Sequence, residues 1–140
     1  MITVVAAVIE RADRRILICQ RRKDDSSPLK WEFPGGKVKT GETLEEALRR
    51  ELREELAVTM TKCQEIGSVR HAYAGGAEEL EIHFFAAEFA EEEIRPAVFE
   101  KVVWALPKEL GGYDFLAANR ELVARLATGV IKAAEILEKE

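Results

Sequence analysis

The sequence predicts an α/β domain in which helices pack against a mixed β-sheet. Apolar runs rich in valine and isoleucine, at residues 2–10 and 15–20, have the length and composition of strands. Residues 44–56 have the apolar spacing of a helix, and further strand-like runs and a helical pattern follow. The chain of 140 residues is long enough for a substantial core, and we expect one domain over residues 1–140.

The first half of the chain divides into two strands, a long loop and a helix. The polar residues 11–14 are expected to connect the two strands tightly. Residues 21–42 predict a loop punctuated by Ser, Pro and Gly, and a loop this long is usually functional or mobile. The helix is expected to begin at residue 44, because Thr43 and Glu46 form a capping-box signature. Its apolar ridge is formed by Leu44, Leu48, Leu52 and Leu56.

The second half begins with a candidate hairpin. Residues 63–75 and 79–89 predict two strands joined by a turn at 74–78. Residues 101–106 predict another strand, which Pro107 stops.

The end of the chain, residues 113–140, predicts one closing helix. Asn119 or Asp114 is expected to cap its start. Its apolar positions are Leu122, Val123, Leu126, Val130 and Ile131.

Charge and composition exclude several classes of function. The net charge is −5 and the pI is near 5.3, so no broad basic surface indicates a nucleic-acid polymer as partner. The first ten residues lack the basic start of a signal peptide, and no apolar run approaches the roughly 20 residues of a membrane span. We therefore expect a cytoplasmic protein without a membrane partner, as a monomer or a homodimer.

The cysteines and histidines are expected to be structural. Cys19 and Cys63 lie far apart in apolar, strand-like surroundings, which is typical of buried free thiols in a reducing compartment. His71 and His83 form an isolated pair on predicted strands, without further metal ligands.

Three glutamates, Glu51, Glu54 and Glu55, fall within five positions of the predicted helix. At 100° per residue they lie beside the leucine ridge rather than on the solvated face. One interpretation is a charged helix face balanced by neighbouring arginines. The other is a metal–phosphate site, because carboxylates at the edge of a core are expensive unless they share a cation. The preceding glycine loop favours the second interpretation, since Mg²⁺ binds carboxylates together with substrate phosphates.

The stretch GKVKTGETLEEALRRELREELAV, residues 36–58, resembles the Nudix box, the signature of hydrolases that cleave nucleoside diphosphates linked to another group. The family pattern is Gly, five residues, Glu, seven residues, then Arg-Glu-aliphatic-any-Glu-Glu-any-Gly-aliphatic. One place departs, because Ala57 stands where the family has a glycine that would end the helix in a left-handed turn. The matching places are held by Gly36, Glu42, Arg50, Glu51, Leu52, Glu54, Glu55 and Val58.

Two further segments, WEFPGGK at 31–37 and YDFLAANRELVARL at 113–126, resemble the MutT-like branch of that family. The resemblance implies a single Nudix hydrolase domain over residues 1–140, built as a Nudix-type α/β/α sandwich with a mixed sheet. It also implies that water attacks a nucleoside triphosphate and releases a nucleoside monophosphate and pyrophosphate.

The resemblance implies roles for particular residues as well. Glu51, or a neighbouring carboxylate such as Glu54, would orient or deprotonate the attacking water, and Arg50 would fix that glutamate by a charge-assisted hydrogen bond. Glu42 would brace the loop against the helix. The ligands of Mg²⁺ or Mn²⁺ would be Glu51, Glu54, Glu55 and the main-chain carbonyl of Gly35.

The candidates for substrate binding are residues at places that the same family uses for contacts with the nucleotide. Either Arg21 or Arg22 is expected to face the nucleotide, because alternation along the strand allows only one to do so. Phe33 is expected to pack on the base or in the core, and Glu32 to contact the sugar or the metal shell. Asn119 matches the place where oxidised-guanine members of the branch read the base, and its amide suits a purine edge; capping of the last helix is the alternative or an additional role.

A further metal-binding acid often lies six residues before a tryptophan in this family. Counted back from Trp104, that place is Val98. Glu100 and the run Glu91, Glu92 and Glu93 are nearby, so the fourth carboxylate remains unassigned.

Several functions are therefore compared. The first is a Mg²⁺-dependent, MutT-like hydrolase that removes oxidised purine nucleotides such as 8-oxo-dGTP, a role in DNA repair. The second is a hydrolase of (d)CTP or of several nucleotides. The others are a Nudix-fold module that binds a nucleotide without cleaving it and a purely structural protein with an acidic helix. The binding module is disfavoured because the box carboxylates are all retained, and the structural protein leaves the PGGK loop unexplained.

Overall fold

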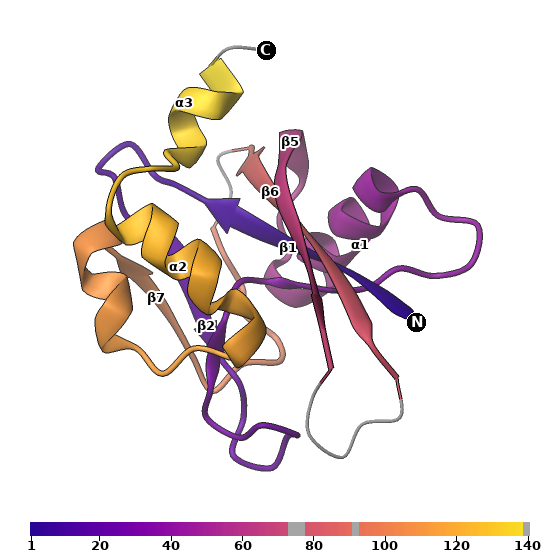
Figure 1. The fold of residues 1–140 in the computed structure, drawn as a ribbon. Coiled ribbons are helices and arrows are strands. Elements are labelled where there is room, and N and C mark those ends of the chain that lie inside the picture. The colour runs from indigo at the N-terminus through magenta and orange to yellow at the C-terminus, as the bar shows by residue number, and fades with distance from the viewer. Residues whose placement is uncertain (73–77, 91–92, 139–140) are drawn as a thin grey trace.

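A computed structural model describes residues 1–72, 78–90 and 93–138 of the chain (Figure 1). Its strands are β1 (Ile2–Ile9), β2 (Ile16–Gln20), β3 (Trp31–Glu32), β4 (Gly35–Lys37), β5 (Met60–His71), β6 (Leu80–Phe89) and β7 (Lys101–Ala105). Its helices are α1 (Leu44–Leu56), α2 (Arg120–Ala127) and α3 (Ala133–Glu138), with the 3₁₀ turns η1 (Pro107–Gly112) and η2 (Ala117–Asn119). No helix in the described part of the chain is long and apolar enough to cross a membrane.

The strands form two sheets. The larger sheet has the order β4-β1-β6-β5 and is mixed, because β1 and β6 are parallel and the other pairs antiparallel. The smaller sheet has the order β3-β2-β7 and is antiparallel. The first two strands of the chain thus belong to different sheets, although a bridge between Glu10 and Ile16 joins their ends.

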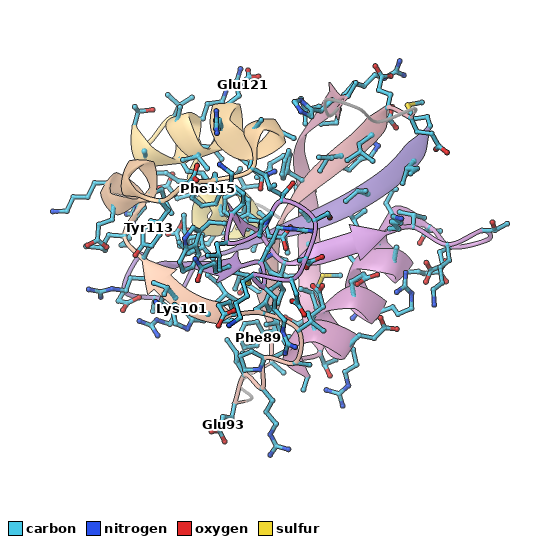
Figure 2. All side chains as sticks on the ribbon, turned by 90° about the horizontal axis from the view of Figure 1, so that it is seen from below. Phe89, Glu93, Lys101, Tyr113, Phe115 and Glu121 are labelled. Atoms are coloured by element: carbon cyan, nitrogen blue, oxygen red, sulfur yellow. The ribbon has the colours of Figure 1, made fainter. Side chains whose placement is uncertain are left out.

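Helices cover both faces of the larger sheet, which confirms the predicted α/β/α sandwich with a mixed sheet (Figure 1). Along β1, Val5 and Ala7 pack with the leucines of α1, whereas Ala6 and Val8 pack with α2 and α3. Phe115, which follows η1, is buried among the side chains on the α2 side (Figure 2).

The start of α1 is as predicted. Thr43 Oγ1 accepts a hydrogen bond from the Glu46 N–H at 3.1 Å, and Glu46 Oε1 accepts one from the Thr43 N–H at 2.8 Å. At the other end Ala57 adopts the left-handed conformation, with φ 59° and ψ 36°, and its N–H donates to the Arg53 carbonyl. Alanine therefore keeps the turn of the family glycine, at a strain of about 1 kcal/mol.

Two expectations about the elements were wrong. The loop predicted at 21–42 contains β3 and β4, because Gly35–Lys37 pairs with β1 and Trp31–Glu32 pairs with β2. Such pairing between distant segments leaves no local signal in strands of two or three residues.

The closing helix is interrupted. Helix α2 ends at Ala127, and Gly129, with φ 79°, donates its N–H to the Leu126 carbonyl at 3.2 Å before α3 begins. This is a glycine helix end, which the apolar periodicity of the segment concealed. Of the predicted apolar positions, Leu122, Val123 and Leu126 are buried, while Val130 is exposed.

Cys19 is buried and Cys63 half-buried, and both are free thiols. His71 and His83 lie on β5 and β6 as expected. The hairpin turn predicted at 74–78 lies almost entirely outside the described residues.

Candidate active site

Two of the three α1 glutamates, Glu51 and Glu55, lie against β4. The Glu51 side chain is 14% exposed and that of Glu54 55% exposed. A Cβ atom added to Gly36 would lie 2.5 Å from Glu51 Cδ. The absence of a side chain at Gly36 is therefore what allows the carboxylate to approach the strand so closely.

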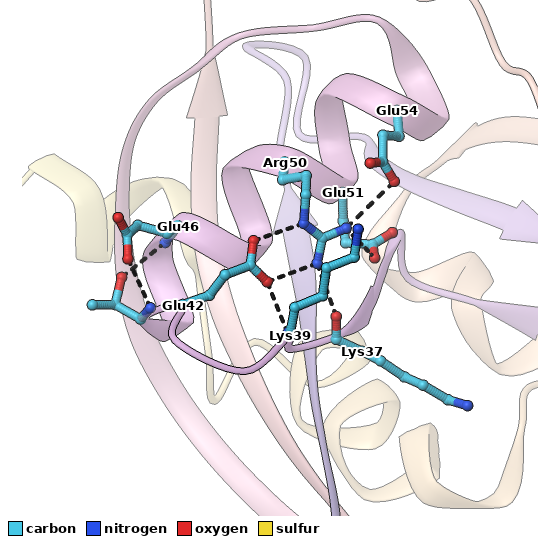
Figure 3. Close-up of polar contacts among 8 residues, drawn as sticks. Lys37, Lys39, Glu42, Glu46, Arg50, Glu51 and Glu54 are labelled. Atoms are coloured by element: carbon cyan, nitrogen blue, oxygen red, sulfur yellow. Dashed lines mark hydrogen bonds and ion pairs between the residues drawn. The ribbon is translucent and has the colours of Figure 1, made fainter.

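Arg50 holds the cluster together (Figure 3). Its Nη1 donates to Glu51 Oε1 at 2.8 Å and to Glu54 Oε2 at 3.4 Å. Its Nε and Nη2 donate to the two oxygens of Glu42 at 2.7 and 2.9 Å, and Nη2 also donates to the Lys37 carbonyl at 3.0 Å. The guanidinium thus joins β4 and the loop that follows it to the glutamates of α1.

Glu42 is the brace that the sequence predicts. Besides the pair of bonds from Arg50, its Oε1 accepts a hydrogen bond from the Lys39 N–H at 2.8 Å. The bonds from Arg50, followed by the bond from Lys39, lower the pKa of Glu42 to about 2. Glu42 is therefore ionised at neutral pH and committed to the scaffold.

Glu55 has a different environment from its two neighbours. Its Oε1 accepts a hydrogen bond from the Gly35 N–H at 3.0 Å. Burial first, and then the charges of nearby glutamates, raise the pKa of Glu55 to about 8 against the lowering effect of the Gly35 bond. The carboxyl group is thus poorly compensated in the structure as it stands.

The donor chemistry of this cluster fits a hard divalent cation. Carboxylates and main-chain oxygens are the ligands that Mg²⁺ prefers, and a cation would offset the charge that burial makes unfavourable at Glu55. Within the described ranges, no three His, Cys, Asp or Glu side chains are placed to share one ion. Glu54, whose side chain is 55% exposed, has room to rotate toward a cation at this place.

A cavity of about 590 Å³ opens beside the cluster, on the α2 side of the larger sheet. Its lining includes Glu55 and Gly36 as well as Phe33 and Asn119. A second cavity, of about 380 Å³, lies near the far end of α2 and contains none of the predicted site residues. The larger cavity is therefore the candidate substrate site.

Arg21, Glu32 and Phe33 all line this cavity. Arg21 Nη1 lies 3.2 Å from Glu32 Oε1, and burial raises the pKa of Glu32 although Arg21 opposes the shift. Phe33 is also part of the core, where its ring contacts those of Phe84 and Phe115 at centroid distances of 6.4 and 5.4 Å. Phe33 thus lies both in the lining of the cavity and in the core.

Arg22 does not line the cavity. Its Nη2 donates to the Ala97 carbonyl at 3.2 Å, so it contacts the loop that precedes β7. This agrees with the expected alternation, by which Arg21 and Arg22 point to opposite sides of the strand end.

Asn119 is 5% exposed and lines the cavity. Its side chain makes no cap hydrogen bond to α2 and none to any other residue in the described ranges, so the capping role was wrong. Asp114 does not cap α2 either, since its carboxylate accepts a bond from Lys30 Nζ at 2.7 Å. The Asn119 amide lies in the lining of the cavity without a protein partner in the described part of the chain, and is therefore available to a ligand there.

Some lining residues had no sequence signal. Loop residues Asp25, Ser26 and Ser27 face the cavity, but nothing in their pattern indicates chemistry. Val98 lines it too, as does its neighbour Phe99, whereas Glu100 does not. Glu91 and Glu92 lie outside the described residues.

Comparisons with known proteins agree with this geometry. Residues 2–126 match the model of the NUDIX domain family. A CTP pyrophosphohydrolase of Escherichia coli is 34% identical over 88% of this chain and 89% of its own. An 8-oxo-dGTP diphosphatase of Proteus vulgaris is 39% identical over 50% of this chain and 62% of its own. A MutT structure from work on Aliivibrio salmonicida and Vibrio cholerae superposes with a TM-score of 0.77 at 29% identity, covering 91% of this chain and 98% of the other.

Proposed function

Because the chain belongs to the Nudix family and is a Nudix hydrolase, we propose that it cleaves nucleoside triphosphates to nucleoside monophosphates and pyrophosphate. The observation that carries this proposal is a cavity of nucleotide size whose lining includes Glu55 of the α1 carboxylate cluster together with Asn119. We further propose Mg²⁺ or Mn²⁺ as the cofactor, because the donor set fits such an ion.

The residues of α1 have different roles in the proposed reaction. The metal would be held by Glu51, Glu54, Glu55 and the Gly35 carbonyl, and when bound it would neutralise phosphate charge and lower the pKa of water. Glu51 accepts the proton of the attacking water, and Glu54 is the alternative acceptor. Arg50 positions Glu51 through the bond at 2.8 Å and itself stays bound to Glu42. Most of the catalytic effect then comes from placement and electrostatics.

For the base we propose an oxidised purine such as that of 8-oxo-dGTP. Asn119 offers a donor and an acceptor from a buried position, and a site with buried polar groups rejects ligands that leave them unpaired. Phe33 packs beside the base and Arg21 near the nucleotide. The name of the Proteus vulgaris relative supports this choice.

A second candidate is (d)CTP or a broad range of nucleotides. It is favoured by the Escherichia coli relative named for CTP, which is similar over most of both chains. The catalytic helix serves either substrate, so the base contacts alone separate the two.

The test is a substrate panel. The purified protein is incubated with Mg²⁺ and equal concentrations of 8-oxo-dGTP, dGTP, dCTP or CTP, with chelator in matched controls, and monophosphate and pyrophosphate are quantified. We expect metal-dependent turnover that is fastest with 8-oxo-dGTP. Preference for a cytosine nucleotide would establish the second candidate, and no metal-dependent turnover of any of the four would contradict the proposed reaction.

A further inference from the structure

The loop at residues 93–100, which we name the wall loop, is fixed to two elements of the catalytic site. It begins at Glu93, which projects from the edge of the molecule, and leads to Lys101 at the start of β7 (Figure 2). The N–H groups of Arg95 and Ala97 donate to the carbonyls of Leu56 and Glu55, at 2.9 and 3.0 Å. The loop thus satisfies two carbonyls at the C-terminal end of α1, which a helix leaves without internal partners.

The second attachment of the wall loop is to β2. The Glu100 N–H donates to the Gln20 carbonyl at 2.8 Å. Arg22, just beyond the end of β2, adds a side-chain hydrogen bond to the loop, from Nη2 to the Ala97 carbonyl at 3.2 Å. Ala97 is therefore held on both sides, by α1 through its N–H and by Arg22 through its carbonyl.

The segment held in this way presents an apolar surface to the cavity. Phe99 packs against the core cluster of α1, and Val98 next to it is 46% exposed and lines the cavity. Other walls of the cavity carry Arg21, Glu32 and Glu55. An exposed valine in such a cavity offers contact to an apolar part of a ligand, since it loses water-exposed area when the ligand binds.

We propose that Val98 contacts the base or sugar of the bound nucleotide and that Arg22 is a positioning residue, which keeps this contact in place through Ala97. The proposal rests on the proposed function, because it takes the ligand to be a nucleoside triphosphate. It assigns Arg22 a different role from the direct substrate contact that the sequence predicts. In this role Arg22 affects substrate affinity through the wall loop. Val98 stands at the place, six residues before Trp104, where the family often has a metal-binding acid.

Two measurements on Arg22→Ala test the positioning role, with Lys23→Ala as a control that removes one exposed charge from the next residue. The first is amide hydrogen exchange of residues 93–100 without nucleotide. Exchange of the wall loop is expected to rise at least threefold in Arg22→Ala, because Arg22 donates a hydrogen bond to the Ala97 carbonyl. In Lys23→Ala, exchange is expected to stay at the parent rate. The second is steady-state kinetics with the best substrate of the panel. KM is expected to rise about fivefold with kcat within twofold, and Arg22→Lys, which can still donate to Ala97, is expected to recover part of the loss.

Val98→Ser tests the contact itself at an exposed position that tolerates a polar side chain. KM is expected to rise about fivefold, while exchange of the wall loop stays at the parent rate. An unchanged KM in Val98→Ser would overturn the contact. A raised KM in Arg22→Ala with unchanged exchange would overturn the positioning role in favour of direct binding. If the parent hydrolyses no triphosphate, the proposed function fails, whereas the exchange comparison still decides whether Arg22 holds the loop.

Discussion

At the scale of single residues, the environment of each side chain decides its role. Glu42 and Glu55 are carboxylates of the same motif, yet bonds from Arg50 lower the pKa of Glu42 to about 2 and burial raises that of Glu55 to about 8. The first is a permanent anion of the scaffold. The second is a group whose charge a bound cation would favour.

Asn119 is the residue on which base selection depends in this account. Asn119→Asp replaces an amide that donates and accepts by a carboxylate that only accepts, which suits the amino group of cytosine better than an oxidised purine. We expect kcat/KM for 8-oxo-dGTP to fall at least tenfold and the ratio of dCTP to 8-oxo-dGTP turnover to rise. The measurement is the same substrate panel on the variant and on Asp114→Asn, an exposed control outside the cavity. An unchanged preference in Asn119→Asp would remove Asn119 from base recognition.

At the scale of elements, local signals placed α1 correctly, whereas strand pairings between distant segments and the interruption between α2 and α3 were missed. The capping box of Thr43 and Glu46 and the leucine ridge fixed the start and the buried face of α1, because both depend on neighbours along one helix. Strands β3 and β4 depend on partners in β1 and β2, and the wall loop depends on carbonyls at the end of α1. The glutamates could therefore be placed from the sequence, whereas Val98 and the role of Arg22 could not.

The C-terminal end of α1 predicts a stabilising substitution. Ala57 has φ 59°, a conformation that glycine adopts without the strain of a Cβ atom. Ala57→Gly is therefore expected to increase the free energy of unfolding by about 1 kcal/mol, measured by denaturant titration. The control is Ala124→Gly on the exposed side of α2, which should lose about 1 kcal/mol because its backbone is helical. A loss of stability in Ala57→Gly would contradict the left-handed helix end.

The brace between Glu42 and α1 predicts a pH dependence of stability. The pKa of Glu42 is lowered in the folded state, so its contribution is present above the ordinary value of about 4.5 and is lost as the pH falls toward about 2. Glu42→Gln should therefore be less stable than the parent near pH 7, and the difference should shrink as the pH falls to about 3. Unfolding free energies at several pH values measure this, with Glu121→Gln on α2 as control. A difference that does not depend on pH would assign the effect to packing rather than to charge.

At the scale of the whole molecule, the sandwich brings three distant parts of the chain to one cavity. Helix α1 supplies Glu55, the ends of β2 and β3 supply Arg21 and Glu32, and the turn before α2 supplies Asn119. The sheet between α1 and α2 holds these parts at fixed positions (Figure 1). In this account chemistry and base selection lie on different elements, so one can change without the other.

The most direct test of the account is the turnover of Glu51→Gln. The substitution keeps the size of the side chain but removes its charge and basicity, so kcat is expected to fall at least about 100-fold. Glu45→Gln, the same change at an exposed position of α1, should stay within twofold of the parent. Turnover of Glu51→Gln within a few-fold of the parent would contradict the assignment of Glu51 as the group that activates water.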